Sequence, residues 1–258
     1  MIILLSPAKS LDFSAHSLKV KASKPPFPDR TAQIAKAASK LTRPKIKKLM
    51  DLSDDLADLN YQRFQSFEAD RDANAPAALT FAGDVYRGLD ARSLNADDMT
   101  WAQDHVRILS GLYGLLRPLD GIQPYRLEMG TKLKIGRKAN LYEFWGADIA
   151  EAVNEAAKDD VIVNLASNEY FKSVDRKALK GRVITPVFKE ITDKGDPRVM
   201  AFYAKYARGA MTRWIIENRI DDTASLTNFK GEGYAYDKAL SSDDEWVFTR
   251  PKPAPKNG

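Results

Sequence analysis

The chain has 258 residues, 44% of them hydrophobic and 10% aromatic, and its formal net charge is +5. These values are typical of a globular protein with a buried core. The chain has no cysteine, which excludes disulfides. Its only histidines are His16 and His105, which argues against a zinc or iron centre. No apolar run reaches the roughly 18 residues of a membrane span, and the run at 2–5 lacks the basic lead of a signal peptide. We therefore expect a cytoplasmic protein with no cofactor and no membrane partner, and composition leaves only a carboxylate-held Mg²⁺ ion open.

The first quarter of the chain is predicted to be mainly helical after one buried strand. The apolar run 1–5 indicates the strand, and it stops at a loop formed by residues 6–10. An extended, proline-rich connector at 24–28 separates this loop from three helices. They are expected at about 30–41, from Thr42-Arg43-Pro44 onward, and from an N-cap at Ser53, with an apolar stripe of Leu56, Leu59, Phe64 and Phe67 on the third.

The rest of the chain mixes strands and helices. Strands are predicted at 77–81, 161–165, 182–188 and 246–248, and helices from Asp97 or Asp98 toward His105, over 141–157 and over 198–219. Asp196 and Pro197 supply an N-cap and a first-turn proline for the last of these helices. The fold class predicted is α+β, with a single domain over residues 1–249 and a disordered basic tail at 250–258.

Charge is arranged in blocks along the chain. Residues 19–48 carry ten Lys/Arg against Asp29, residues 51–104 carry twelve Asp/Glu against four Arg, and residues 105–140 carry seven Lys/Arg against Asp120 and Glu128. On the helix predicted at 198–219, five cations fall within an arc of about 140°: Arg198, Lys205, Arg208, Arg213 and Arg219. Two interpretations stay open, namely solvated faces of alternating sign or a basic groove for a polyanion.

Four short segments combine charge with glycine, hydroxyl or aromatic side chains. The loop 6–10 offers Lys9 and two hydroxyls for an anion, and polar residues from Asn164 to Lys172, Glu169 among them, crowd the end of an apolar strand. The other two segments are Gly83-Asp84-Val85-Tyr86-Arg87 and Tyr125-Arg126-Leu127-Glu128-Met129-Gly130. Each of these could form a site, or Arg126 could pair with Glu128 or Asp84 as a structural ion pair.

The stretch LSGLYGLLRPLDGIQPYR at 109–126 is too punctuated for one helix and too apolar for a solvated loop. A helix–hairpin–helix unit would grip a nucleic-acid phosphate with backbone amides, using a helix at 98–108, the hairpin Gly111-Leu112-Tyr113-Gly114 and a second helix that starts with Leu115-Leu116-Arg117. The glycines are one residue further apart than such hairpins usually have them. An ordinary buried turn is the alternative.

Seven of these segments together resemble the YaaA family of bacterial peroxide-stress proteins. The segments are LLSPAK at 4–9, FAGDVY at 81–86, LSGLYGLLRPLD at 109–120, YRLEMG at 125–130, LYEFW at 141–145, NLASNEYFK at 164–172 and KYARGAMTRWII at 205–216. The resemblance implies a compact α+β domain with a mixed sheet surrounded by helices, a helix–hairpin–helix-like element, and a positively charged cleft that binds duplex DNA. It also implies protection of DNA and protein from peroxide through limitation of free iron.

Carried onto this chain, the resemblance implies a set of DNA- or phosphate-binding residues: Lys9, Ser110, Gly111, Gly114, Arg117, Arg126, Lys172, Lys205, Arg208 and Arg213. Two other classes of function stay open. An enzyme acting on a small anionic or nucleotide-like substrate would use acid/base and clamping groups, with Lys9, Asp84, Tyr86, Glu128 and Glu169 as the candidate catalytic residues. A scaffold with structural ion pairs and no ligand is the third class. Convergence of the candidate residues in one pocket would favour the enzyme, and an open groove would disfavour it.

Overall fold

The apolar run at the N-terminus forms the central strand of the fold, as predicted. In the computed structural model, which describes residues 1–69, 71–158 and 160–253, strand β1 (Ile2–Leu5) is completely buried. It pairs in parallel with β4 (Val106–Ser110) on one side and β6 (Ile162–Asn164) on the other. A strand enclosed at both edges and on both faces has no solvent side, which explains its continuous run of Ile and Leu.

Eight strands of the described residues form one mixed sheet in the order β5-β4-β1-β6-β7-β10-β9, with β8 paired to β7. Neighbours among β4, β1, β6, β7 and β10 are parallel, whereas β5, β8 and β9 are antiparallel to their partners. The remaining strands are β5 (Gly114–Leu116), β7 (Val183–Ile191), β8 (Pro197–Arg198), β9 (Ala235–Tyr236) and β10 (Glu245–Pro251), and β2 (Ser10–Leu11) pairs separately with β3 (Phe81–Ala82). Because the chain adds β4 to one side of β1 and β6 to the other, the order reverses at β1, where open α/β sheets place their ligands.

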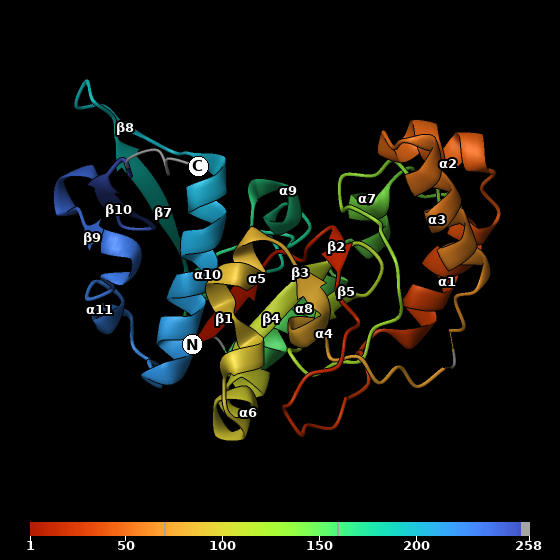
Figure 1. The fold of residues 1–258 in the computed structure, drawn as a ribbon, viewed down its shortest axis with the longest axis horizontal. Coiled ribbons are helices and arrows are strands. Elements are labelled where there is room, and N and C mark those ends of the chain that lie inside the picture. Colours follow the sequence, from red (N-terminus) through yellow and green to blue (C-terminus); the bar gives the residue numbers. More distant parts are fainter. Residues whose placement is uncertain (70, 159, 254–258) are drawn as a thin grey trace.

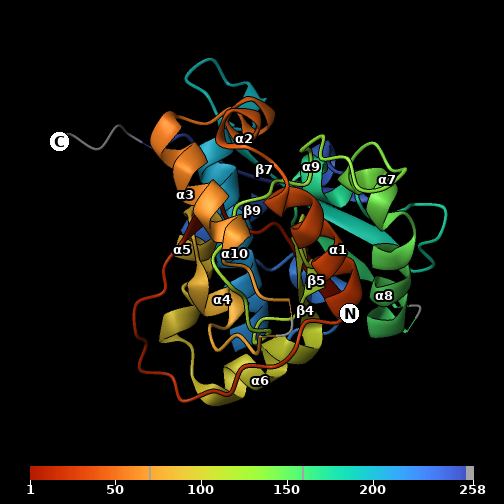
Figure 2. The same cartoon turned by 90° about the vertical axis from the view of Figure 1, so that its right-hand side faces the viewer.

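Helices surround this sheet, as predicted (Figure 1). They are α1 (Pro28–Ser39), α2 (Arg43–Met50), α3 (Asp54–Gln65), α4 (Ala77–Thr80), α5 (Asp84–Leu89), α6 (Ala96–His105), α7 (Leu141–Trp145), α8 (Asp148–Ala157), α9 (Asn168–Phe171), α10 (Ala201–Glu217) and α11 (Thr223–Leu226), with 3₁₀ turns at Ala91–Ser93, Gly231–Gly233 and Lys238–Leu240. Figure 1 shows α10 beside α5 in the middle of the molecule and α1–α3 gathered at one end. Figure 2 shows this end from the front, with α1 lying near α7 and α8.

The three N-terminal helices confirm the prediction for the first quarter of the chain. The Ser53 hydroxyl caps α3 by accepting a hydrogen bond from the Leu56 backbone N–H. The predicted apolar stripe is wrong in part, because Phe64 is buried whereas Leu56 and Leu59 are exposed. The buried residues of α3 are Ala57, Asn60 and Phe64.

Two predicted elements differ from the structure. The strand predicted at 77–81 is the short helix α4 followed by β3, and the Thr80 hydroxyl donates to the Pro76 carbonyl one turn back. Short apolar runs fit a buried helix as well as a strand, so periodicity could not separate them. The helix predicted over 141–157 is divided into α7 and α8 at Gly146, whose φ of 51° lies in the left-handed region.

The C-terminal part of the chain departs from prediction at two boundaries. The helix expected over 198–219 begins at Ala201, because Pro197 and Arg198 pair with β7 as β8. The predicted start of the disordered tail at residue 250 is wrong, because Arg250 and Pro251 continue β10 and pair with β7. Arg250 is buried. Residues 254–258, which also belong to the predicted tail, lie outside the described residues.

Of the helix–hairpin–helix predicted over 98–117, the first helix is present as α6, but a β-hairpin replaces the rest. Helix α6 ends at His105, and β4 and β5 then pair antiparallel around residues 111–113. The glycines fit close packing: a Cβ on Gly111 would lie 2.4 Å from the Leu127 carbonyl oxygen, and one on Gly114 would enter the Trp145 ring. Of the two alternatives for this segment, the buried turn is the one that the structure contains.

Candidate functional site

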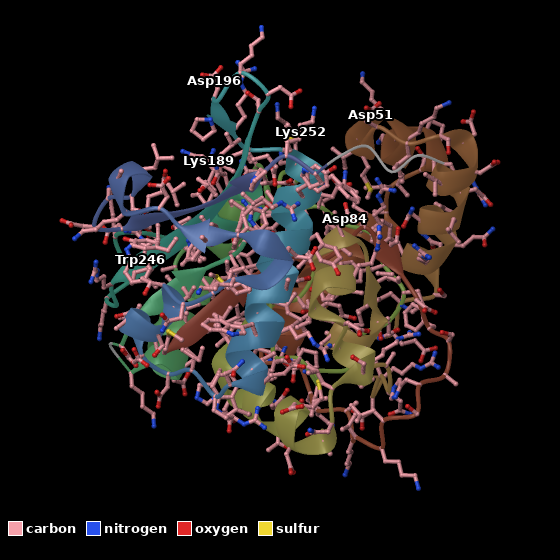
Figure 3. The ribbon with its side chains drawn as sticks, turned by 60° about the vertical axis from the view of Figure 1, so that its left-hand side comes forward. Asp51, Asp84, Lys189, Asp196, Trp246 and Lys252 are labelled. Carbon is pink, nitrogen blue, oxygen red and sulfur yellow. The ribbon has the colours of Figure 1, made fainter. Side chains whose placement is uncertain are left out.

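A cavity of about 260 Å³ opens at the carboxyl ends of β1 and β6. Its walls come from the loop 6–10, the residues around the start of α5, Glu128, the start of α9 and the middle of α10. Six charged side chains line it: Lys9, Asp84, Glu128, Glu169, Lys205 and Arg208. In Figure 3, Asp84 lies on the half of the molecule that carries Asp51 at the α2–α3 turn, and Trp246 lies on the other half. The lining residues of the cavity come from segments far apart in the sequence, and they meet at the carboxyl end of β1, where the strand order reverses.

Glu128 is held between two cations. Its Oε2 atom lies 2.8 Å from Lys9 Nζ and its Oε1 atom 3.2 Å from Arg126 Nη2. Arg126 and Glu128 are both mostly buried, with side chains 17% and 22% exposed. The structural ion pair that the sequence left as an alternative is thus present for Arg126 with Glu128. Lys9, at 61% exposure, extends this chain of charges to the mouth of the cavity.

The other two carboxylates have unused hydrogen-bonding capacity. Glu169 Oε1 accepts a hydrogen bond of 2.9 Å from the Gly130 backbone N–H, and Asp84 Oδ1 lies 3.5 Å from Arg87 Nη1. Within the described chain, the second carboxylate oxygen of each residue has no hydrogen-bond or ion-pair partner. Each carboxylate can therefore accept a hydrogen bond from a ligand in the cavity.

Hydroxyl groups join the two strand ends beneath these charges. Ser6, directly after β1, accepts from the Ser167 backbone N–H at 2.8 Å and donates to the Ser167 hydroxyl at 3.3 Å. Tyr86 does not line the cavity; it is buried behind it, and its hydroxyl donates to the Ser6 carbonyl at 3.0 Å. Burial raises the pKa of Tyr86, and of Tyr170 in the cavity wall, well above the ordinary value. Tyr86 is thus placed to position the 6–10 loop.

Two cations of α10 face the cavity, and neither has a carboxylate partner in the part of the chain that the structure describes. No acidic side chain of the described residues lies within ion-pair distance of Lys205 or Arg208, and burial lowers the pKa of the Arg208 guanidinium. Since a desolvated cation is stabilised by an opposite charge, Arg208 is suited to an anionic ligand. Lys172, next to α9, stands 5.1 Å from the centre of the Tyr142 ring.

The remaining predicted site residues lie elsewhere. Arg213 pairs with Asp90 and Glu217 and joins α10 to the turn after α5. Arg117 pairs with the buried Asp120 and borders a different hollow, which also contains Met1. Ser110, Gly111 and Gly114 are buried, so their backbone cannot reach a phosphate. Of the predicted binding residues, Lys9, Lys205 and Arg208 line the cavity, and Arg126 lies behind Glu128. The residues of the β4–β5 hairpin do not line it.

Arg63 is a cation near the site that sequence reasoning did not select. Burial and repulsion from Arg126 lower the pKa of its guanidinium, which places the two positive groups close together between α3 and the 125–130 segment. Nothing in the sequence around Arg63 distinguishes it from other helix-surface arginines. Only the packing of α3 against the body of the protein brings it to Arg126.

The described residues contain no group of three or more His, Asp or Glu side chains arranged to hold a metal ion. Among these residues, no helix combines the length and the apolar character needed to cross a bilayer.

The fold and site define an α/β protein with a mixed sheet and a polar, charge-lined cavity at the carboxyl ends of its parallel strands. The chain belongs to the family described as peroxide stress protein YaaA, which matches residues 1–240. It is 53% identical over 257 residues to a UPF0246 protein of Maricaulis maris, covering 98% of this chain and 97% of that protein. UPF0246 proteins of Roseobacter denitrificans and Caulobacter vibrioides are 52% and 50% identical, over 98% of this chain and 100% of each relative.

Proposed function

We propose that this chain serves the peroxide stress response as a duplex-DNA-binding protein that limits the damage caused by free intracellular iron. The observation that carries the proposal is the pair Lys205 and Arg208, one helical turn apart on α10 and without carboxylate partners in the described chain. Unpaired cations on one helix face are suited to phosphate oxygens. Membership of the family described as peroxide stress protein YaaA supports the peroxide-stress part of the proposal.

Side chains rather than the backbone of the β4–β5 hairpin would bind the phosphates. A cavity of about 260 Å³ is far too small for a duplex, so the DNA would lie across its mouth. A second basic element is the hairpin of α2 and α3, joined by a turn in which Asp51 has a φ of 49°. Its Lys45 and Lys48 are exposed, while Asp54 and Asp55 at the start of α3 disfavour phosphate at that helix end.

The proposal predicts weak sequence preference and a steep dependence on salt. Changing Lys205→Glu together with Arg208→Glu should weaken binding to every duplex alike and reduce the salt slope by about 0.9 for each phosphate that the variant no longer neutralises. A gel-shift series at several salt concentrations measures both effects. The matched control is Lys177→Glu with Lys180→Glu, which makes the same charge change beside α8 and should alter affinity by less than about twofold.

Absent or salt-insensitive binding by the unaltered protein would contradict DNA binding. Equal loss of affinity in the two double variants would also contradict the assignment to α10, because net charge alone would then account for the effect.

A second candidate function is catalysis on a small anionic or nucleotide-like substrate. The convergence of Lys9, Asp84, Glu128 and Glu169 with two cations in one cavity favours it. A carboxylate near such a substrate can serve as a general acid or base once the substrate's proton lies within hydrogen-bond reach. Incubation with a panel of phosphorylated small molecules, followed by mass spectrometry, tests this function. Turnover should disappear in Glu169→Gln, and turnover retained by that variant would exclude Glu169 from the chemistry.

A further inference from the structure

The charges of the cavity that have no opposite charge fully pairing them in the described chain fall into two groups, cations on one helix and carboxylates at the starts of two others. Lys205 and Arg208 stand on α10, whereas Asp84 and Glu169 stand at the starts of α5 and α9. The third carboxylate, Glu128, is already neutralised by Lys9 and Arg126. A ligand that satisfies the cavity therefore has an anionic end and an end rich in hydrogen-bond donors.

The cationic group favours a phosphate at the anionic end. Arginine presents a planar fork of donors that matches two phosphate oxygens, and lysine adds a point charge for a third. Burial lowers the pKa of Arg208, so an anion beside it would recover a desolvation cost that no protein carboxylate in the described chain offsets.

The acidic group favours hydroxyls at the other end. Glu169 is fixed by the Gly130 backbone N–H through one oxygen, which leaves the second available to other donors. A Cβ on Gly130 would come within 3.1 Å of Glu169 Oε1, so the absence of a side chain at this position permits the hydrogen bond. Carboxylates held in this way accept hydrogen bonds from sugar hydroxyls.

Size and wall chemistry limit the ligand further. About 260 Å³ lies below the range of roughly 300–1,000 Å³ typical of drug-sized ligands. Tyr170 is the one aromatic side chain among the lining residues in the described chain, and it is only 8% exposed. The walls thus lack the aromatic platform on which a nucleobase would stack.

We propose that the cavity binds the monophosphate of a pentose, with Arg208 and Lys205 on the phosphate and Asp84 and Glu169 on the sugar hydroxyls. This inference rests on the second candidate function, ligand binding in the cavity, and does not need a duplex across the mouth. A phosphate could come from a free sugar phosphate or from the phosphorylated 5′ end of a DNA strand. Only the free sugar phosphate also offers hydroxyls to Asp84 and Glu169, because the terminal deoxyribose of the strand has its 3′ oxygen in a phosphodiester and no 2′ hydroxyl.

Titration calorimetry of the full chain with ribose 5-phosphate, inorganic phosphate and ribose tests the proposal. Ribose 5-phosphate should bind at least about tenfold more tightly than phosphate, because only it uses both charge groups. Arg208→Gln should weaken both phosphate ligands by about tenfold or more, and Asp84→Asn should weaken ribose 5-phosphate alone. Lys205→Gln, at an exposed position, gives a second cation variant if Arg208→Gln does not fold.

The matched control is Arg198→Gln, an exposed arginine on β8 that stands 3.6 Å from Asp196, and it should bind ribose 5-phosphate like the unaltered protein. Equal affinity for phosphate and ribose 5-phosphate would overturn the sugar site. Unchanged affinity in both cation variants would overturn the phosphate site.

Two further arms identify the source and separate this inference from DNA binding. If a duplex with a 5′-phosphate binds more tightly than one with a 5′-hydroxyl, and ribose 5-phosphate abolishes the difference, the cavity takes the phosphate of a DNA end and the assignment of Asp84 and Glu169 to sugar hydroxyls is overturned. If the ligand is a free sugar phosphate, the two duplexes should bind alike. A covalently closed duplex, which has no 5′ end, reports DNA binding alone. Binding of that duplex without binding of ribose 5-phosphate would sink the cavity proposal while leaving the DNA proposal standing.

Discussion

Arg250, which belongs to the tail predicted to be disordered, forms a buried ion pair with Glu190 of β7. Glu190 has no exposed surface, and its carboxylate accepts from the Tyr234 hydroxyl and from the Met200 backbone N–H. Arg250 Nε lies 3.4 Å from Glu190 Oε1, and its guanidinium stands 4.3 Å from the centre of the Tyr234 ring. These interactions join β7 and β10 to the start of α10, the helix that carries Lys205 and Arg208.

Removing one member of this pair should cost far more than removing a surface charge. Glu190→Ala leaves the buried Arg250 with only the Glu232 carboxylate, 4.0 Å away and partly exposed, as an opposite charge in the described chain. We expect the free energy of unfolding to fall by about 3–5 kcal/mol. Urea denaturation measures the decrease. Asp244→Ala is the control, because its pair with Arg182 is exposed on both sides and should contribute less than about 1 kcal/mol. Similar decreases in the two variants would show that the buried pair has no special role.

At the scale of elements, two facing glycines set the distance between α5 and α10. A Cβ on Gly209 would lie 1.8 Å from the Val85 carbonyl oxygen, and one on Gly88 would lie 2.1 Å from the Tyr206 carbonyl oxygen. The two helix backbones therefore touch directly. Since Asp84 begins α5 and Arg208 precedes Gly209, this close approach also fixes the separation of the acidic and cationic sides of the cavity.

Gly209→Ala should destabilise the protein although alanine favours helices by about 1 kcal/mol. The added methyl group has no space, so α10 must move away from α5, and overpacking of this kind costs about 1–3 kcal/mol. Thermal unfolding followed by circular dichroism measures the change. Ala201→Gly, at the exposed start of the same helix, is the control for propensity and should cost no more than about 1 kcal/mol. A more stable Gly209→Ala variant would show that the backbones do not touch.

The elements that sequence analysis predicted correctly owe their structure to local patterns. Continuous apolar runs indicated the central strands, and a capping serine indicated the start of α3. Within the segment 98–117 the helix up to His105 was predicted correctly, but the part after it was predicted wrongly. The glycines there are required by close contacts with distant residues, Leu127 and Trp145, which no local spacing reveals. Of the candidate site, the charged residues could be named from the sequence but their grouping could not. Their grouping depends on how separate elements pack. This packing pairs Glu128 with Lys9, buries Arg208 and brings Arg63 close to Arg126.

At the scale of the whole molecule, buried tyrosines link stability to pH. Tyr86, Tyr113, Tyr125 and Tyr170 come from four separate segments and pack into the core beneath the cavity. The Tyr113 and Tyr125 rings meet edge to face, with centres 5.3 Å apart. Burial raises the pKa of all four phenols above the ordinary value of 10.0, because an ionised phenolate would lose its hydration there.

The sign of the resulting pH dependence follows from proton binding. Below about pH 10 these tyrosines are protonated in both states, so their contribution to stability is fully present. Above it the unfolded chain releases protons that the folded chain keeps, and each such tyrosine lowers the free energy of unfolding by about 1.4 kcal/mol per pH unit until the folded pKa is passed. Urea denaturation at several values between pH 9 and 11 should show this decline.

Tyr125→Phe should make the decline shallower by about 1.4 kcal/mol per pH unit, because one buried phenol is removed. The variant also loses the hydrogen bond with Ser110 at every pH. Tyr113→Phe removes a second buried phenol, whose oxygen accepts a hydrogen bond from the Gln123 backbone N–H. It should reduce the slope of the free energy of unfolding against pH by the same amount, and the double variant should reduce the slope by twice that amount. A slope that neither variant alters would show that the buried phenols ionise in the folded protein as they do in the unfolded chain.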